Sequence, residues 1–147
     1  MKILVLNGPN LNMLGIREPG IYGKSSFADL LKLLEDVSAE LNIEIEQYQS
    51  NHEGDLVAKI QWAYGKVAGI VINPAAYTHT SVAILDALKA VSIPAVEVHI
   101  SDVDAREAFR QISYAGLACC KTIKGHGLAG YREAILYLDQ LLNHTIS

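Results

Sequence analysis

The feature that most constrains the fold of this chain is the alternation of short β-like runs with amphipathic helical stretches. The β-like runs occupy residues 2–6, 44–48, 68–72, 95–100 and 121–124. Stretches with the three- and four-residue apolar spacing of a helix follow them, at residues 27–41, 56–64, 82–89, 105–112 and 131–142. Strands joined through helices run parallel, and the helices cover both faces of the resulting sheet.

Five such units in 147 residues predict one flavodoxin-like domain, an α/β three-layer sandwich with a five-stranded parallel sheet and helices on both faces. A chain of this size buries about 70% of its unfolded surface, which suffices for one core. Sheets of this kind bind ligands beyond the carboxyl ends of their strands. Polar residues directly after a strand are therefore the candidates for a functional site.

Charge and composition exclude several classes of partner. The net charge is −4 and no block of Lys and Arg is present, which argues against nucleic acid and acidic membranes as partners. No apolar run approaches the roughly 20 residues of a membrane span, and the first run is too short for a signal peptide, so a cytoplasmic protein is expected. The adjacent Cys119 and Cys120 have neither disulfide-framework nor metal-ligand spacing, and buried reduced thiols are expected. Half of the residues are hydrophobic, a surplus that suits a core or a subunit contact.

A long polar loop follows the first strand. It begins with Asn7-Gly8-Pro9-Asn10 and continues to about residue 24, whereas connections from strand to helix usually have about 2–6 residues. Arg17 and Tyr22 lie on it, and no turn requires either side chain. The segment at about 15–24 is therefore interpreted as a lid over a substrate.

The third and fourth strands also end in polar residues. Asn73 and His79 follow the third strand, where Ser81 or Thr80 is expected to cap the next helix. His79 either binds a ligand or satisfies backbone groups. Glu97 and His99 end the fourth strand on one face, so the carboxylate can orient the imidazole for acid–base chemistry. The alternative is a buried structural pair.

The segment after His99 is a candidate anion site. Backbone N–H groups near Ser101, with the positive end of a helix at 105–112, are suited to a carboxylate. Arg106 and Arg110 would share one face of that helix, and one of them is expected to be only solvated or paired with an acid.

Three motif matches fail on their context. Residues 125–130 fit a dinucleotide fingerprint, but too little chain follows to supply the ribose-binding acid, so these glycines are interpreted as allowing tight strand–helix contact. Gly23-Lys24-Ser25 lacks the earlier glycine of a P-loop, and His52-Glu53 lacks the second His of a zincin. No metal and no cofactor are implied.

Taken together, these segments resemble the type II 3-dehydroquinases (3-dehydroquinate dehydratases). The resemblance covers nearly the whole chain and includes, in order, residues 6–11, 73–79, 97–99, 106–110 and 130–131. It implies a flavodoxin-like lyase subunit in a homododecamer built from trimers. The implied reaction is a cofactor-free anti elimination of water from 3-dehydroquinate, through an enolate, to give 3-dehydroshikimate. That chemistry serves both the shikimate pathway of aromatic amino acid biosynthesis and quinate breakdown, and the sequence does not choose between them.

The resemblance also implies roles for individual residues. Ionised Tyr22 matches the base, Arg17 the group that lowers its pKa, and Asn10 the residue holding a water against the enolate oxygen. His99 matches the acid that protonates the leaving hydroxyl, oriented by Glu97. The residues matching substrate-binding positions are Asn73, His79, Arg110, the backbone of Ile100 and Ser101, and Asp86 from a neighbouring subunit.

Some positions depart from the family pattern, and other flavodoxin-like classes fit less well. Leu85 stands where Arg is frequent, Asp102 where Asn is common and Lys121 where Gly is common.

A phospho-receiver needs acids after the first strand and an Asp ending the third, where this chain has Asn residues. A flavin carrier needs a Ser/Thr/Gly-rich loop after the first strand, which is also missing.

Overall fold

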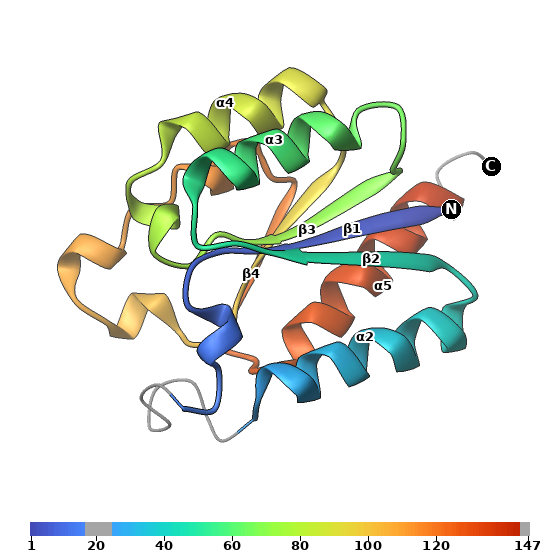
Figure 1. Ribbon diagram of the computed structural model, residues 1–147, viewed down its shortest axis with the longest axis horizontal. Helices are drawn as coiled ribbons and strands as arrows, with labels where there is room; N and C mark the ends of the chain where they lie inside the picture. Colours follow the sequence, from blue (N-terminus) through green and yellow to red (C-terminus); the bar gives the residue numbers. More distant parts are fainter. Residues whose placement is uncertain (17–24, 145–147) are drawn as a thin grey trace.

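A five-stranded parallel sheet forms the centre of the molecule (Figure 1). The computed structural model describes residues 1–16 and 25–144. The strands are β1 (Lys2–Asn7), β2 (Glu44–Gln49), β3 (Gly69–Asn73), β4 (Ala95–His99) and β5 (Lys121–Lys124), in the spatial order β2-β1-β3-β4-β5. All neighbouring pairs are parallel, and this is the flavodoxin-like strand order. The predicted fold class is confirmed.

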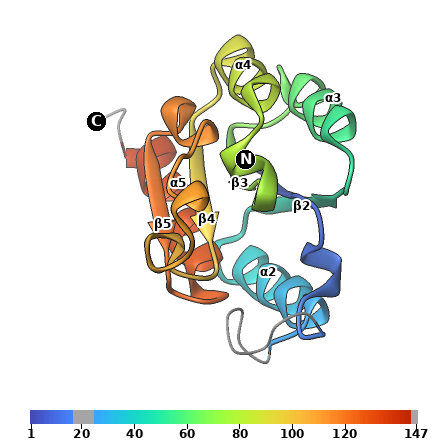
Figure 2. The same ribbon diagram turned by 90° about the vertical axis from the view of Figure 1, so that its left-hand side faces the viewer.

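In the part of the chain that the structure describes, four α-helices cover the sheet. They are α2 (Phe27–Leu41), α3 (Glu53–Ala63), α4 (Val82–Val91) and α5 (Ala129–His144). Helices α3 and α4 lie on one face, and α2 and α5 on the other (Figures 1 and 2). The predicted segment at 56–64 starts three residues late, because Glu53 and Asp55 in the first turn of α3 add no apolar residue to the pattern. These carboxylates are stabilised by the positive end of the helix dipole.

Successive side chains of each strand point to opposite faces of the sheet, so the sheet separates two apolar cores. In β1, Ile3 and Val5 join the core under α2 and α5, while Leu4 and Leu6 join the core under α3 and α4. All four side chains are fully buried. β1 is therefore covered on both faces, as expected of a central parallel strand.

The prediction of a helix at residues 105–112 is wrong. In its place, η3 (Val103–Ala105) and η4 (Ala108–Arg110) are short 3₁₀ turns, separated by extended backbone at Arg106. The side-chain amide of Gln111 donates to the carbonyls of Val103 and Arg106 at 2.9 and 3.1 Å, supplying hydrogen bonds that a helix would make along its backbone. The apolar residues that suggested the helix are not core residues, since Phe109 is 63% exposed and Ile112 54% exposed.

The strand order changes direction between β1 and β3, and this point is where such sheets bind ligands. Figure 2 looks toward the loops at the carboxyl ends of the strands. Asn7 and Asn73 end the two strands as direct cross-strand neighbours, and the N–H of Gly8 donates to the carbonyl of Asn73 at 2.8 Å. A Cβ on Gly8 would lie 2.4 Å from the carbonyl oxygen of Pro74, so only glycine allows this close approach.

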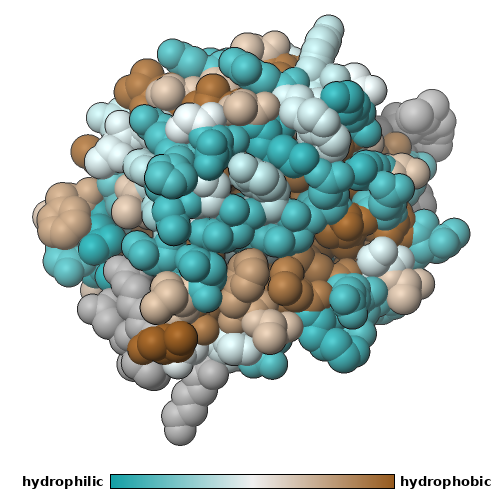
Figure 3. Space-filling view, in the orientation of Figure 1, coloured by the Kyte–Doolittle hydropathy of each residue, from teal (hydrophilic) through white to brown (hydrophobic). Residues whose placement is uncertain are grey.

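An apolar groove runs along the edge strand β2. It has a volume of about 410 Å³. Its lining residues come from α2 and β2: Leu31, Leu34, Glu35, Ser38, Ala39, Ile45 and Gln47. Apolar surface gathers in this band of the molecule (Figure 3). Across residues 1–16 and 25–144, no helix is both long and apolar enough to cross a membrane.

Candidate active site

A pocket opens at the carboxyl ends of β1, β3 and β4. Seven of the side chains or backbone segments singled out from the sequence line it, namely Asn10, Asn73, His79, His99, Ile100, Ser101 and Arg110. The other lining residues are Pro9, Leu11, Ala75, Ala76, Val103 and Arg106. Residues more than 90 positions apart in the chain thus meet at the place that the strand order indicates.

Glu97 and His99 form a buried pair at the end of β4. Oε2 of Glu97 lies 3.2 Å from Nε2 of His99, and the two side chains are 1% and 6% exposed. The predicted shared face is confirmed. An N–H on Nε2 would not point at this oxygen, so the contact does not count as a hydrogen bond. Among the described residues Nε2 has no hydrogen-bond partner. The contact is therefore chiefly electrostatic.

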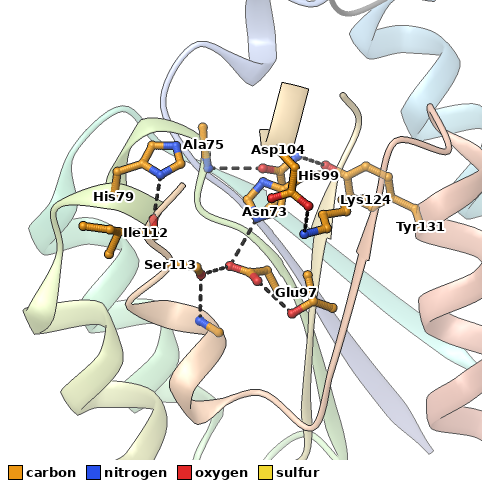
Figure 4. Close-up of polar contacts among 12 residues, drawn as sticks. Asn73, Ala75, His79, Glu97, His99, Asp104, Ile112, Ser113, Lys124 and Tyr131 are labelled. Carbon is orange, nitrogen blue, oxygen red and sulfur yellow. Dashed lines mark hydrogen bonds and ion pairs between the residues drawn. The ribbon is translucent and has the colours of Figure 1, made fainter. Parts of the chain in front are cut away.

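Two hydroxyl groups hold the Glu97 carboxylate. Ser113 donates to Oε2 (Figure 4). Thr122 donates to Oε1 at 2.9 Å. Burial raises the pKa of Glu97, but the nearby His99 ring and these two hydroxyl groups outweigh it and hold the pKa below its usual value. Glu97 is thus a carboxylate at neutral pH. Sequence reasoning missed Ser113 and Thr122; the only available signal was that Thr122 lies opposite Glu97 in the predicted sheet.

Asn73 and His79 enter the pocket from the β3 end. Oδ1 of Asn73 accepts from the backbone N–H of Ala75 at 3.1 Å. Nδ1 of His79 donates to the carbonyl of Ile112 at 2.8 Å, which leaves Nε2 as the second polar atom of the ring (Figure 4). The alternative that His79 satisfies a backbone group is therefore confirmed; His79 also lines the pocket, and its binding of a ligand stays a prediction. Ser81, as expected, caps α4 by accepting from the N–H of Ile84 at 3.0 Å.

The loop after β4 is tied to the loop after β5. Gly125 donates to the carbonyl of Ser101 at 3.1 Å, and Gly127 donates to the carbonyl of Ile100 at 3.1 Å. Both glycines have positive φ values, which suit them to this turn. A Cβ on Gly130 would lie 3.3 Å from Cγ1 of Val98, which confirms that this glycine allows tight strand–helix contact. The glycine-rich segment therefore positions the Ile100–Ser101 backbone.

Arg106 and Arg110 both line the pocket, although they do not share a helix face. Nε of Arg110 donates to Oε2 of Glu107 at 2.7 Å, while Nε of Arg106 lies 4.0 Å from the same oxygen. The side chains are only 12% exposed for Arg106 and 19% for Arg110. Arg110 is thus paired with an acid, as expected for one of the two arginines, and it also lines the pocket. The pocket wall carries two cations, and sequence reasoning had placed only Arg110 in the site.

Polar residues at the end of β2 fix the loop that carries Asn10. The backbone N–H of Asn10 donates to Oδ1 of Asn51 at 3.0 Å. The side-chain amide of Gln49 donates to the carbonyl of Gly8 at 3.1 Å and to Oδ1 of Asn51 at 3.1 Å. Asn10 has a positive φ of 71°, which asparagine tolerates better than most residues. Gln49 and Asn51 were not recognised from the sequence.

The sequence-predicted site residues still to be placed are Arg17, Tyr22 and Asp86. Arg17 and Tyr22 lie outside the described residues. Asp86 is exposed on α4 and does not line the pocket of its own chain.

The expectation that both cysteines are buried is partly wrong, because Cys120 is exposed. Burial raises the pKa of Cys119 to about 12, so that thiol stays protonated.

Comparison with known proteins decides the family. The model of the family described as Dehydroquinase class II matches residues 1–139. The chain belongs to the class II dehydroquinase family. A curated 3-dehydroquinate dehydratase of Fusobacterium nucleatum is 55% identical over 146 residues, covering 97% of this chain and 99% of that protein. The crystal structure of the type II dehydroquinase from Butyrivibrio crossotus superposes with a TM-score of 0.93 at 55% identity, covering 95% of this chain and 97% of that one. The type II dehydroquinase of Propionibacterium acnes gives a TM-score of 0.88 at 43% identity, covering 97% of this chain and 96% of that one.

The departures from the dehydroquinase pattern have structural explanations. Oδ1 of Asp102 accepts from the backbone N–H of Asp104 at 3.0 Å, so this carboxylate caps η3 and does not line the pocket. Leu85 is a buried residue of α4, only 7% exposed. Nζ of Lys121 lies 5.1 Å from the centre of the Tyr137 ring.

Proposed function

We propose that this protein is a 3-dehydroquinate dehydratase that eliminates water from 3-dehydroquinate to give 3-dehydroshikimate. The observation that carries the proposal is the buried Glu97–His99 pair, with its nitrogen and oxygen 3.2 Å apart, at a pocket lined by Asn10, Asn73, His79 and Arg110. The family and the names of its relatives agree with this chemistry.

The pocket suits a polyhydroxylated carboxylate. Asn73 and His79 present an amide and an imidazole to ring hydroxyl groups. The Ile100–Ser101 backbone, held by the glycine loop, is placed for a carboxylate, and two arginines supply positive charge nearby. Substrate binding is thus assigned to Asn73, His79, Ile100, Ser101 and Arg110.

The proposed elimination proceeds in two proton transfers. The phenolate of Tyr22 removes a proton from the carbon next to the ketone, and the electron pair moves onto the ketone oxygen to give an enolate. Asn10 holds a water against that oxygen. When the enolate collapses, the C–O bond on the neighbouring carbon breaks, and His99 gives its proton to the departing hydroxyl, which leaves as water. No cofactor or metal is needed for these steps.

Nδ1 of His99 is the atom to which we assign the transferred proton. Nε2 is buried next to the Glu97 carboxylate, so it is directed away from any ligand in the pocket. Glu97 fixes the ring position and balances the positive charge of the protonated imidazole. A general acid so placed typically accelerates a reaction about 10²–10⁴-fold.

The segment at about 15–24 is proposed to act as the lid. It carries Tyr22 and Arg17, and a cation beside a tyrosine favours the phenolate by about 1–3 pKa units. Because an unperturbed tyrosine has a pKa of about 10, it needs such a partner to act as a base near neutral pH.

A homododecamer of trimers is the proposed assembly. Asp86 is exposed on α4, close in sequence to Val82, which is 49% exposed, and Phe109 and Ile112 are exposed near the pocket wall. Exposed apolar residues of this size favour a contact with another chain. Asp86 would then reach the pocket of a neighbouring subunit.

Ultraviolet absorbance provides the test. The product is a conjugated enone, so absorbance rises as 3-dehydroquinate is consumed. With substrate deuterated stereospecifically at the carbon next to the ketone, the anti course predicts loss of the one label that lies opposite the leaving hydroxyl. No absorbance change at high enzyme concentration would overturn the proposed function. A colourless purified protein would in addition exclude the flavin carrier.

A further inference from the structure

Tyr131 is a fully buried polar residue in the apolar core beneath α2 and α5. It lies in the first turns of α5 and packs with Ile3, Val71 and Ile135, all 0% exposed. A hydroxyl group placed in such surroundings is costly unless it is hydrogen-bonded. Phenylalanine would fill the same space without that cost, so the hydroxyl calls for an explanation.

The Tyr131 hydroxyl joins the ends of the two strands that flank the ligand-binding edge of the sheet. It donates to Oδ1 of Asn7 at 2.6 Å. It accepts from Nδ2 of Asn73 at 2.9 Å (Figure 4). Nδ2 of Asn7 in turn donates to Oε1 of Gln47 at 3.1 Å. All three bonds run in one direction, because Oδ1 of Asn7 needs a donor and, within residues 1–16 and 25–144, the tyrosine proton is the one that supplies it.

This network fixes the side-chain amide of Asn73 from both ends. Oδ1 accepts from the N–H of Ala75 at 3.1 Å, and one hydrogen of Nδ2 is committed to Tyr131. A flipped amide would place Nδ2 against the N–H of Ala75 and Oδ1 against a tyrosine oxygen whose hydrogen is already donated to Asn7. Both hydrogen bonds would be lost. The second hydrogen of Nδ2 is left for a ligand, and Asn73 lines the pocket.

We propose that Tyr131 is a positioning residue of the active site, whose hydroxyl holds Asn73 so that its amide N–H faces a hydroxyl group of the substrate. The inference rests on the proposed function, because that function supplies the substrate. Tyr131 itself is separated from the pocket by Asn73 and acts only through it.

A double-mutant cycle on kcat/KM tests the inference. In Tyr131→Phe, the ring still fills the core but Asn73 loses the acceptor that orients it. We expect kcat/KM to fall roughly 2- to 12-fold, the effect of one hydrogen bond, mainly through a higher KM. In the Asn73→Ala background, Tyr131→Phe should have no further effect on kcat/KM, since the group it positions is absent.

The alternative outcome is equally definite. If Tyr131 only stabilises the fold, Tyr131→Phe lowers kcat/KM by the same factor in both backgrounds, or in neither, and the inference is wrong. Ile135→Val is the matched control, because it removes one methylene from the same core one turn further along α5 and touches no polar group. It should lower the melting temperature and leave kcat/KM unchanged.

A second variant approaches the network from its other end. Asn7→Leu removes the acceptor of the tyrosine proton, which then competes with the N–H of Ala75 for Oδ1 of Asn73. Asn7 does not line the pocket, yet Asn7→Leu should raise KM, and Asn73→Ala should abolish that effect. This variant carries the test if Tyr131→Phe does not fold, and a normal KM in folded Asn7→Leu would overturn the inference. A wild-type protein inactive on 3-dehydroquinate would instead contradict the proposed function.

Discussion

Glu97 and His99, two residues apart on β4, place a carboxylate oxygen 3.2 Å from an imidazole nitrogen at the pocket-facing end of the sheet. Ser113 and Thr122 hold that carboxylate from two other segments of the chain. In the proposed mechanism His99 transfers a proton and Glu97 orients the imidazole, and these two tasks should respond differently to substitution.

His99→Ala should lower kcat by about 10²–10⁴-fold while the protein still folds, because the proton donor is lost. Glu97→Gln should lose less, since the imidazole remains and only its orientation and charge balance suffer. Steady-state rates with 3-dehydroquinate provide the measurement. His126→Ala is the control, because His126 forms an exposed pair with Glu133 away from the pocket. A near-normal kcat in His99→Ala with reduced thermal stability would indicate a structural histidine.

The acid dependence of stability should carry a contribution from Glu97. Its pKa is lower in the folded protein than the ordinary value of 4.5, so the unfolded chain binds a proton more readily. The stabilisation is therefore complete above pH 4.5 and is lost as the pH falls through the folded pKa. Urea unfolding at fixed protein concentration, compared between wild type and Glu97→Gln, should show a difference that shrinks in acid. A difference that stays constant from neutral to acid pH would contradict this assignment.

Tyr22→Phe should abolish turnover at every pH, because phenylalanine cannot accept the substrate proton. Arg17→Gln should reduce activity at neutral pH and move the ascending limb of the kcat–pH profile to higher pH, since without the cation the tyrosine ionises less readily. Tyr64→Phe, at a residue 64% exposed, is the control. Substantial activity in Tyr22→Phe would refute the base assignment. A profile that falls in height without moving would make Arg17 a positioning group only.

Activity should survive borohydride in the presence of substrate, because an enolate mechanism forms no imine. Lys124, the lysine at the carboxyl end of β5, is paired with Asp104 and does not line the substrate pocket. Mass spectrometry after borohydride treatment provides the readout. Inactivation together with a mass gain on one lysine would replace the enolate by an imine route. Chelators should likewise leave the rate unchanged.

Light scattering should report about twelve subunits, or at least a trimer, if Asp86 serves a neighbouring pocket. Asp86→Ala should then lower kcat/KM roughly 10- to 150-fold, the effect of removing a hydrogen bond to a charged group. Asp36→Ala, which breaks an exposed pair with Lys32, is the control and should leave kcat/KM unchanged. A fully active monomer would remove Asp86 from the site.

The strands, most of the helices and the edge of the sheet that carries the candidate site could be predicted from the sequence. Apolar periodicity reports which face of a local segment is buried, and for that reason it identified the strands and four of the helices within a few residues. The same reasoning placed His99 and Asn73 at strand ends, where parallel topology brings them together. It failed at 105–112, because the apolar residues there are exposed and a single side chain, Gln111, decides the backbone path.

The groups that support the candidate site residues became evident from the folded chain. Ser113 and Thr122 reach Glu97 across 16 and 25 positions, and Tyr131 reaches Asn7 across 124. A buried polar group must find a hydrogen-bond partner, but its identity depends on strand order and helix placement. Local periodicity contains no information on strand order or on helix placement. The candidate site residues could therefore be proposed from the sequence, whereas the residues that hold them in place required the folded chain.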